Sequence, residues 1–145
     1  MLFLACALHD VGLTDAGNGS QRFEVDGADL AASFMTDRGF AAEAVDTVWQ
    51  AIALHTSPGI VERRGAVCAL SRGGIVIDAE AQLIHAAYPR LSAVRELYGA
   101  ISDQVAARPE KGPFTSLPWH VAQPRNANGL NHFEDQMIAT SRWGS

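Results

Sequence analysis

The clearest indication of fold class is the stretch AAEAVDTVWQAIALH, residues 41–55. Its apolar positions recur at intervals of three, four and three residues, which places them on one face of an α-helix, with Glu43 and Gln50 turned away. That face carries Val45, Val48, Ile52 and His55. The sequence Ser57-Pro58-Gly59 follows and predicts that the helix ends there. The stretch is therefore read as an amphipathic helix with a histidine at the end of its apolar face.

Further helices are expected on both sides of this stretch. Residues 1–10 read as the last turns of an apolar helix, and the glycine-rich residues 11–24 read as a loop. Asp26 is expected to cap a helix that runs to Arg38 and stops at Gly39. Downstream, helices are predicted over residues 65–72, 79–87 and 91–107, with Gly73-Gly74 interrupting the first and residues 75–77 forming a helical turn. The prediction is an all-α bundle of about five to six helices.

The composition changes after Arg108. Residues 109–145 contain four of the six prolines and show no clear periodicity, so they are expected to form an irregular C-terminal extension. Residues 1–108 are expected to be the helical domain. The whole chain has 145 residues and is 48% hydrophobic, which excludes a disordered or collagen-like protein.

The net charge and the apolar segments of the chain restrict its possible partners and location. The chain has 11 basic and 16 acidic side chains, a net charge of −5, which argues against coating nucleic acid or binding an anionic membrane surface. The apolar start, residues 1–8, lacks a basic n-region, and no segment approaches the length of a membrane span. Cys6 and Cys68 lie in apolar stretches and are expected to be free thiols. We therefore expect a soluble, cytoplasmic protein, and the sequence leaves its oligomeric state open.

Four residues could carry chemistry. His9 and Asp10 lie near a helix end, where an imidazole and a carboxylate can converge on one ion, although a solvated helix terminus is the simpler interpretation. His55 could be a site residue or a core histidine bonded to a carbonyl. Asp78 follows three β-branched residues and, if buried, needs a partner or a metal, but it could equally cap a helix beginning at Ala79. Together they suggest two histidines and two aspartates around one divalent cation.

Several separated segments resemble the HD-domain superfamily, in particular the bacterial HD proteins similar to fungal cyanamide hydratases. The segments are Leu8–Gly12, Arg22–Ala28, Ala51–Thr56 and Asp78, and the likeness covers roughly residues 2–100. The resemblance implies an HD-type helical bundle in which His9, Asp10 and Asp78 bind a divalent metal ion (Zn, Mn, Fe, Ni or Mg). It implies that His55 is a further ligand or a general acid/base, and that Glu24, with neighbouring Arg22 and Phe23, lines the substrate pocket.

The chain departs from the superfamily pattern in one respect. The pattern's first histidine lies on a helix upstream of the HD pair, and no histidine precedes His9 in this sequence. With one ligand fewer, a weaker metal site is expected. The resemblance still implies an enzyme that uses metal-activated water to hydrolyse a small molecule, most simply a phosphoester. Hydration of a small nitrile is the alternative chemistry, and a catalytically impaired domain that serves as a binding or interaction module is the alternative class.

Overall fold

The computed structural model describes residues 1–80 and 93–140, and only the backbone at residues 77–80, 93–94 and 137–140. Every regular element in these ranges is helical, which confirms the predicted all-α class. The chain divides into two compact units, Met1–Ile75 and Val76–Ser145. This division by packing falls within a helix, whereas the boundary expected from composition lies at residue 108. None of the helices in the described residues is long and apolar enough to cross a membrane.

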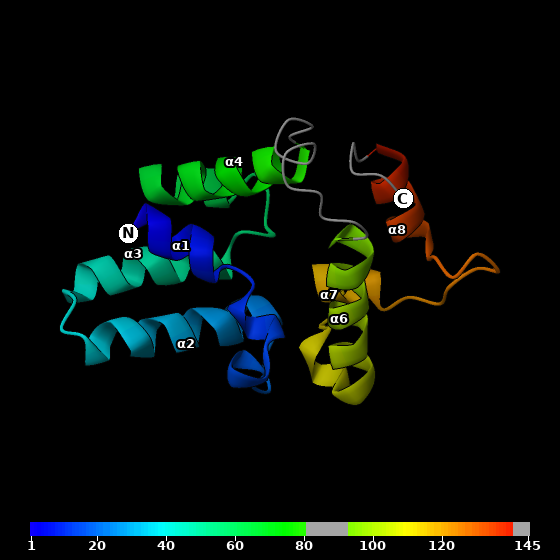
Figure 1. Cartoon of the computed structure of the whole chain (residues 1–145), viewed down its shortest axis with the longest axis horizontal. Coiled ribbons are helices and arrows are strands. Elements are labelled where there is room, and N and C mark those ends of the chain that lie inside the picture. The colour runs from blue at the N-terminus through cyan, green and yellow to red at the C-terminus, as the bar shows by residue number, and fades with distance from the viewer. Residues whose placement is uncertain (81–92, 141–145) are drawn as a thin grey trace. The chain divides into compact units, whose positions relative to one another are not determined.

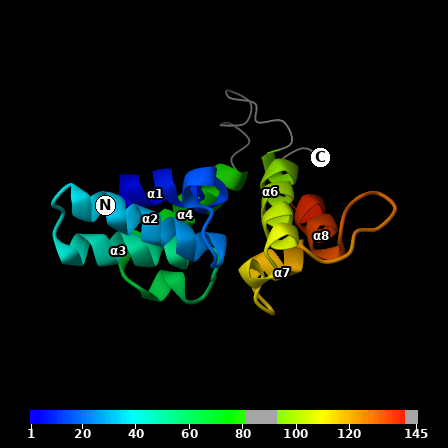
Figure 2. The same cartoon turned by 90° about the horizontal axis from the view of Figure 1, so that it is seen from below.

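The first unit is built around two long helices, α2 (Phe23–Asp37) and α3 (Ala42–Ala53), which pack along each other, with α1 (Leu2–Leu8) against α3 (Figures 1 and 2). The core between them consists largely of small residues, which lets the helix backbones approach closely. Val48 and Ile52 are fully buried, so the face predicted for residues 41–55 is confirmed. The core residues are Ala5, Ala28, Ala31, Met35, Val48, Ala51, Ile52, Ala53, Val61 and Cys68.

The start of α2 differs from the prediction. The helix begins at Phe23, with Arg22 at the N-cap position, so Asp26 lies one turn inside the helix and does not cap it. Its carboxylate accepts the backbone N–H of Gln21 at 3.2 Å and so stabilises the chain that leads into the helix. The end of α2 is as predicted, because Gly39 adopts a left-handed φ of 76°.

The next helix also differs from the prediction. Helix α4 (Ala66–Glu80) runs without interruption through Gly73 and Gly74. Glycine disfavours a helix interior by only about 1 kcal/mol, and packing outweighs that cost here. A Cβ on Gly74 would lie 4.0 Å from the Cys6 sulfur, an ordinary van der Waals distance, so α4 passes near α1 at this position. Asp78 is within this continuous helix, which rules out the alternative that it caps a helix beginning at Ala79. The helix predicted over 79–87 lies mostly outside the described residues.

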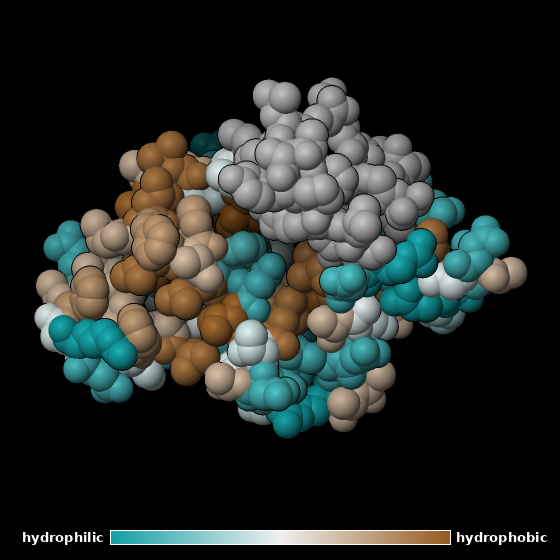
Figure 3. Space-filling model, viewed as in Figure 1, coloured by the Kyte–Doolittle hydropathy of each residue, from teal (hydrophilic) through white to brown (hydrophobic). Residues whose placement is uncertain are grey.

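Some large apolar side chains of the first unit remain exposed. On α1 and α4 these are Leu2, Phe3 and Leu70, and Figure 3 shows hydrophobic surface over this part of the unit. The connection between α3 and α4 contains the short 3₁₀ helix η3 (Val61–Arg63).

The second unit contains α6 (Ala93–Ala107), the 3₁₀ helix η4 (Pro109–Lys111), α7 (Leu117–Val121) and α8 (His132–Thr140). Helix α6 packs against η4 and α7, and α7 against α8. The described part of the region expected to be irregular, residues 109–140, thus contains short helices separated by irregular segments. A single buried residue joins two of them, because the Asn131 amide donates to the carbonyls of Val121 and His120 at 2.7 and 3.1 Å. Its Oδ1 accepts the Glu134 N–H and caps α8.

Candidate functional site

The HD pair lies where α1 ends and the chain turns toward α2. His9 is the C-cap of α1, and Val11–Leu13 form the 3₁₀ helix η1, followed by a second, η2 (Asp15–Gly17). Gly12 fixes the position of this turn, because a Cβ there would overlap the Phe23 carbonyl at the start of α2. Gly27, one turn along α2, meets the Gly12 backbone from the other side. The two glycines let η1 lie directly on α2, and this contact holds Asp10 in place.

The third residue reaches this position from α3. His55 lies two residues beyond the end of that helix, and the residue is only 5% exposed. The rings of His9 and His55 meet edge to face, with centroids 5.2 Å apart and an interplanar angle of 85°. Phe23 packs edge-on against the His55 ring at 5.8 Å. The fold therefore brings together two histidines that are 46 positions apart in sequence.

Both imidazole rings are oriented by the backbone. The Nδ1 of His9 lies 2.8 Å from the Cys6 carbonyl oxygen, and the Nδ1 of His55 lies 2.7 Å from that of Ile52. A carbonyl can only accept, so each Nδ1 must carry a proton and donate it. A neutral ring then presents the lone pair of Nε2 on its opposite side. The interpretation of His55 as a histidine bonded to a carbonyl is thus confirmed for Nδ1. Its Nε2 makes no bond to that carbonyl and is the nitrogen that could bind a cation or transfer a proton.

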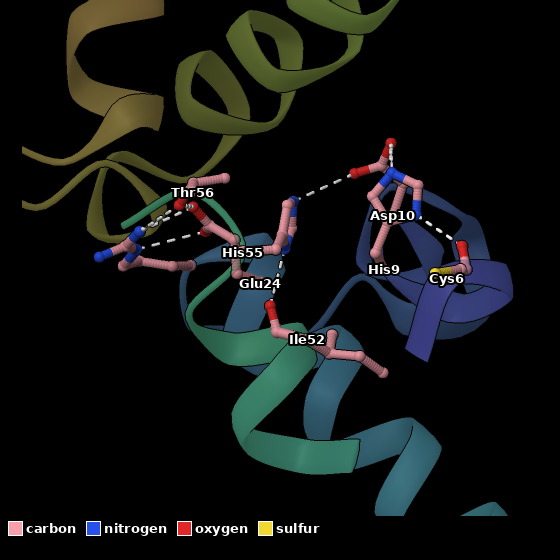
Figure 4. A network of polar contacts seen from close by, with 8 residues as sticks. Cys6, His9, Asp10, Glu24, Ile52, His55 and Thr56 are labelled. Atoms are coloured by element: carbon pink, nitrogen blue, oxygen red, sulfur yellow. Dashed lines mark hydrogen bonds and ion pairs between the residues drawn. The ribbon is translucent and has the colours of Figure 1, made fainter. Parts of the chain in front are cut away.

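Asp10 lies between the two Nε2 atoms (Figure 4). Its Oδ2 is 3.1 Å from Nε2 of His9, and its Oδ1 is 3.6 Å from Nε2 of His55, a separation longer than a hydrogen bond. We call His9, Asp10 and His55 the His–Asp–His cluster. Partial burial raises the pKa of Asp10, but the interactions with His55 and His9 outweigh this effect and hold the pKa well below its usual range.

The arrangement of the cluster favours positive charge between its three side chains. If both rings were neutral, two Nε2 lone pairs would face a carboxylate, and all three groups would present negative charge to one another. Positive charge between them removes this repulsion, either as protons on the rings or as a bound cation. Imidazole nitrogen and carboxylate oxygen are also the donor types that divalent transition metals take in proteins. The donor chemistry of the cluster therefore suits a cation.

The number of donors is incomplete. Among the side chains that the structure describes, those of residues 1–76 and 95–136, no group of three or more His, Cys, Asp and Glu is arranged to hold a metal ion. Asp78, the remaining predicted ligand, lies in α4, and its side chain is outside the described residues. The cluster thus offers partners for a cation without forming a closed site by itself.

The predicted pocket residues Glu24 and Arg22 form a second polar group beside His55. Glu24 is fully buried, and Arg22 binds it with two nitrogens, at 2.7 and 3.2 Å. The hydroxyl of Thr56 donates to the same carboxylate at 2.6 Å. In Figure 4, Glu24 and Thr56 lie on the side of His55 away from Asp10. Both oxygens of Glu24 are thus occupied by protein groups, and Phe23, the third predicted pocket residue, is 2% exposed and packs on His55.

Sequence reasoning missed two contributors to this site. Thr56 directly follows His55, and only the approach of α2 shows that its hydroxyl meets Glu24. The pair Gly12 and Gly27 was also missed, because nothing in the sequence says which backbones touch. Comparison of the chain with protein-family models, with curated proteins and with solved structures finds no match.

Proposed function

We propose that this protein is a metal-dependent hydrolase of a small molecule and that its site is built on the His–Asp–His cluster. The observation that supports the proposal is the commitment of both Nδ1 atoms to backbone carbonyls, which turns both Nε2 atoms toward the Asp10 carboxylate. Metal-binding histidines are commonly oriented in this way, by a hydrogen bond from the ring nitrogen that does not bind the metal. The resemblance to HD domains, which rests on different observations, suggests the same residues.

In this proposal His9 and Asp10 bind the divalent ion, and the resemblance to HD domains implies Asp78 as a further ligand. A divalent cation so held supplies Lewis acidity and lowers the pKa of water toward neutrality. His55 is the residue that moves a proton, at Nε2, because its Nδ1 is fixed to the Ile52 carbonyl. Phe23 and the carbonyl of Ile52 keep the ring in one orientation, so that Nε2 remains on the side of Asp10.

The substrate class depends on which side chains of the predicted pocket are available to bind a substrate. A phosphoester is the substrate that the sequence suggests first, and it requires Arg or Lys side chains. Arg22 belongs to the predicted pocket, but it is bound to Glu24. This observation favours a second candidate, hydration of a small neutral nitrile, which requires no cationic side chain. The two candidates share the same cluster and the same proton carrier.

The test begins with metal content. Protein purified without chelator or nickel resin is supplemented with Zn, Mn, Fe or Ni and measured by elemental analysis, and then screened on phosphoesters and small nitriles. We expect near-stoichiometric metal in the wild type, and large losses of metal and turnover in His9→Ala and Asp10→Asn. His132→Ala is the control, because His132 is exposed at the start of α8.

Two results would overturn the proposal. One is metal far below stoichiometry that no supplement raises, which would support a binding or interaction module in place of an enzyme. The other is unchanged metal and turnover in both His9→Ala and Asp10→Asn, which would place the chemistry elsewhere in the chain.

A further inference from the structure

Beside the His–Asp–His cluster lies a buried carboxylate that the proposed chemistry does not use. Glu24 is 0% exposed and belongs to the first turn of α2. A buried carboxylate destabilises a protein unless charge or hydrogen bonds compensate for the lost solvation. Here Arg22 provides two charge-assisted contacts and Thr56 a third, at 2.6 Å. Protein groups thus satisfy the hydrogen-bonding capacity of both carboxylate oxygens.

The hydrogen bond between Glu24 and Thr56 affects the His–Asp–His cluster because Thr56 directly follows His55 in the chain. Helix α3 ends at Ala53, so His55 lies in a turn, where α-helical hydrogen bonds no longer fix its conformation. In this turn the Ile52 carbonyl accepts two hydrogen bonds from His55, one from the backbone N–H at 3.3 Å and one from the ring Nδ1 at 2.7 Å. The next residue, Thr56, is fixed from outside by Glu24.

Two neighbouring residues of α2 therefore act on two neighbouring residues after α3. Phe23 packs against the His55 ring, and Glu24 accepts the Thr56 hydroxyl. Arg22 also donates to Thr56 Oγ1, at 3.2 Å, and closes a triangle of three polar groups. We call Arg22, Glu24 and Thr56 the Glu24 triad.

We propose that Glu24 is a positioning residue: through Thr56 it holds the turn after α3, so that the Nε2 of His55 faces Asp10. The role of His55 as a proton carrier rests on the proposed function, whereas its orientation by Glu24 does not. The positioning proposal can therefore be tested on protein that contains no metal.

The sharpest variants alter the hydroxyl of Thr56. Thr56→Val replaces the hydroxyl with a methyl group of similar size and removes the donor to Glu24, while Thr56→Ser keeps a hydroxyl. Glu24→Gln places an amide NH₂ group against Arg22 and so breaks one of the two hydrogen bonds between Arg22 and residue 24. The control for loss of a buried glutamate charge is Glu134→Gln, because Glu134 is 2% exposed and is held by Arg125 at 2.7 Å in the second unit.

The first measurement is a long-range ¹H–¹⁵N NMR spectrum of the histidine rings in metal-free protein, at a pH above the range in which histidine titrates. His55 in the wild type should show a single Nδ1–H tautomer, and so should Thr56→Ser and Glu134→Gln. In Thr56→Val and Glu24→Gln we expect a mixture of tautomers at His55, with His9 affected less. Thermal melts monitored by circular dichroism establish that each variant is folded, and if Glu24→Gln does not fold, the Thr56 pair decides.

The second measurement is the affinity for Zn²⁺ by titration calorimetry. Because His55 carries a proton in the proposed function and is not one of its ligands, we expect Thr56→Val and Thr56→Ser to bind zinc as tightly as the wild type, whereas His9→Ala should bind it more weakly. An unchanged His55 tautomer in folded Thr56→Val would overturn the positioning proposal. If the wild type binds none of Zn, Mn, Fe and Ni, the metal proposal fails while the NMR result still decides on Glu24.

Discussion

His9 and His55 lie edge to face with their ring centroids 5.2 Å apart, and each ring directs Nε2 toward the carboxylate of Asp10. Neither ring is free to reverse, because each Nδ1 donates to a carbonyl three residues earlier, in Cys6 and Ile52. A reversed ring would place its Cδ2–H group against that carbonyl and lose the hydrogen bond. The same local device thus orients two histidines from different helices toward one acid.

The low pKa of Asp10 predicts a pH dependence of stability in metal-free protein. A carboxylate whose pKa is lower in the folded state stabilises that state above its unfolded pKa, about 3.9 for aspartate. The contribution is lost as the pH falls through the folded value. We expect the wild type to exceed Asp10→Asn in free energy of unfolding by up to about 1 kcal/mol near pH 5, since solvent screens this half-exposed group. The difference should shrink toward zero in acid, as measured by urea unfolding across that range. A difference that grows on acidification would contradict the prediction.

The contact between η1 and α2 predicts opposite effects of two glycine substitutions. Gly12→Ala forces a methyl group against the Phe23 carbonyl, and we expect a loss of about 1–3 kcal/mol in free energy of unfolding. Gly73→Ala places a methyl group in open space on α4, where replacing glycine in a helix is expected to gain about 0.5–1 kcal/mol. Chemical denaturation of both variants checks the signs. Equal effects at the two positions would be incompatible with close packing at Gly12.

Tyr98 should ionise at an unusually high pH. Burial raises the pKa of its hydroxyl to about 12, and the charge of Glu134 acts in the same direction. Near-ultraviolet absorbance should resolve a tyrosine that titrates near pH 12, and this component should be absent in Tyr98→Phe. Because the folded pKa is raised, the stability contribution is complete below about pH 10, the unfolded value, and is lost as the pH rises through the folded one. Glu134→Gln should lower the pKa of Tyr98.

Asn131 is expected to be the most sensitive polar residue of the second unit. Its amide donates to carbonyls at the end of α7, and its oxygen caps α8, so Asn131→Ala leaves buried groups at both helices without partners. We expect a loss of about 2 kcal/mol in free energy of unfolding. Asn128→Ala, at an exposed loop position, should be nearly neutral. A thermal or denaturant melt compares the two, and similar stabilities would refute the bridging role of Asn131.

Much of the first unit could be predicted because its signals are local. The 3-4-3 spacing of Val45, Val48, Ile52 and His55 predicts a buried helical face, and Val48 and Ile52 are fully buried. Gly39 ends α2 as predicted, because a left-handed residue there suits glycine. The errors occurred where packing outweighed local preference: Gly73-Gly74 do not break α4, and Asp26 lies inside α2. In the C-terminal region Asn131 joins α8 to α7, and its bonds to the carbonyls of His120, Val121 and Gln123 span eight to eleven residues of sequence.

The sequence by itself determined the helical class and marked His9, Asp10 and His55 as chemically notable, because helix periodicity and residue type are local properties. Only the tertiary structure decided that both Nδ1 atoms are bound to carbonyls, that both Nε2 atoms face one carboxylate, and that Glu24 is joined to Arg22 and Thr56. These relationships depend on the close approach of η1 and of the turn after α3 to the start of α2. That approach is set by packing over the whole unit, at positions such as Gly12 and Gly27, and no short stretch of sequence specifies it.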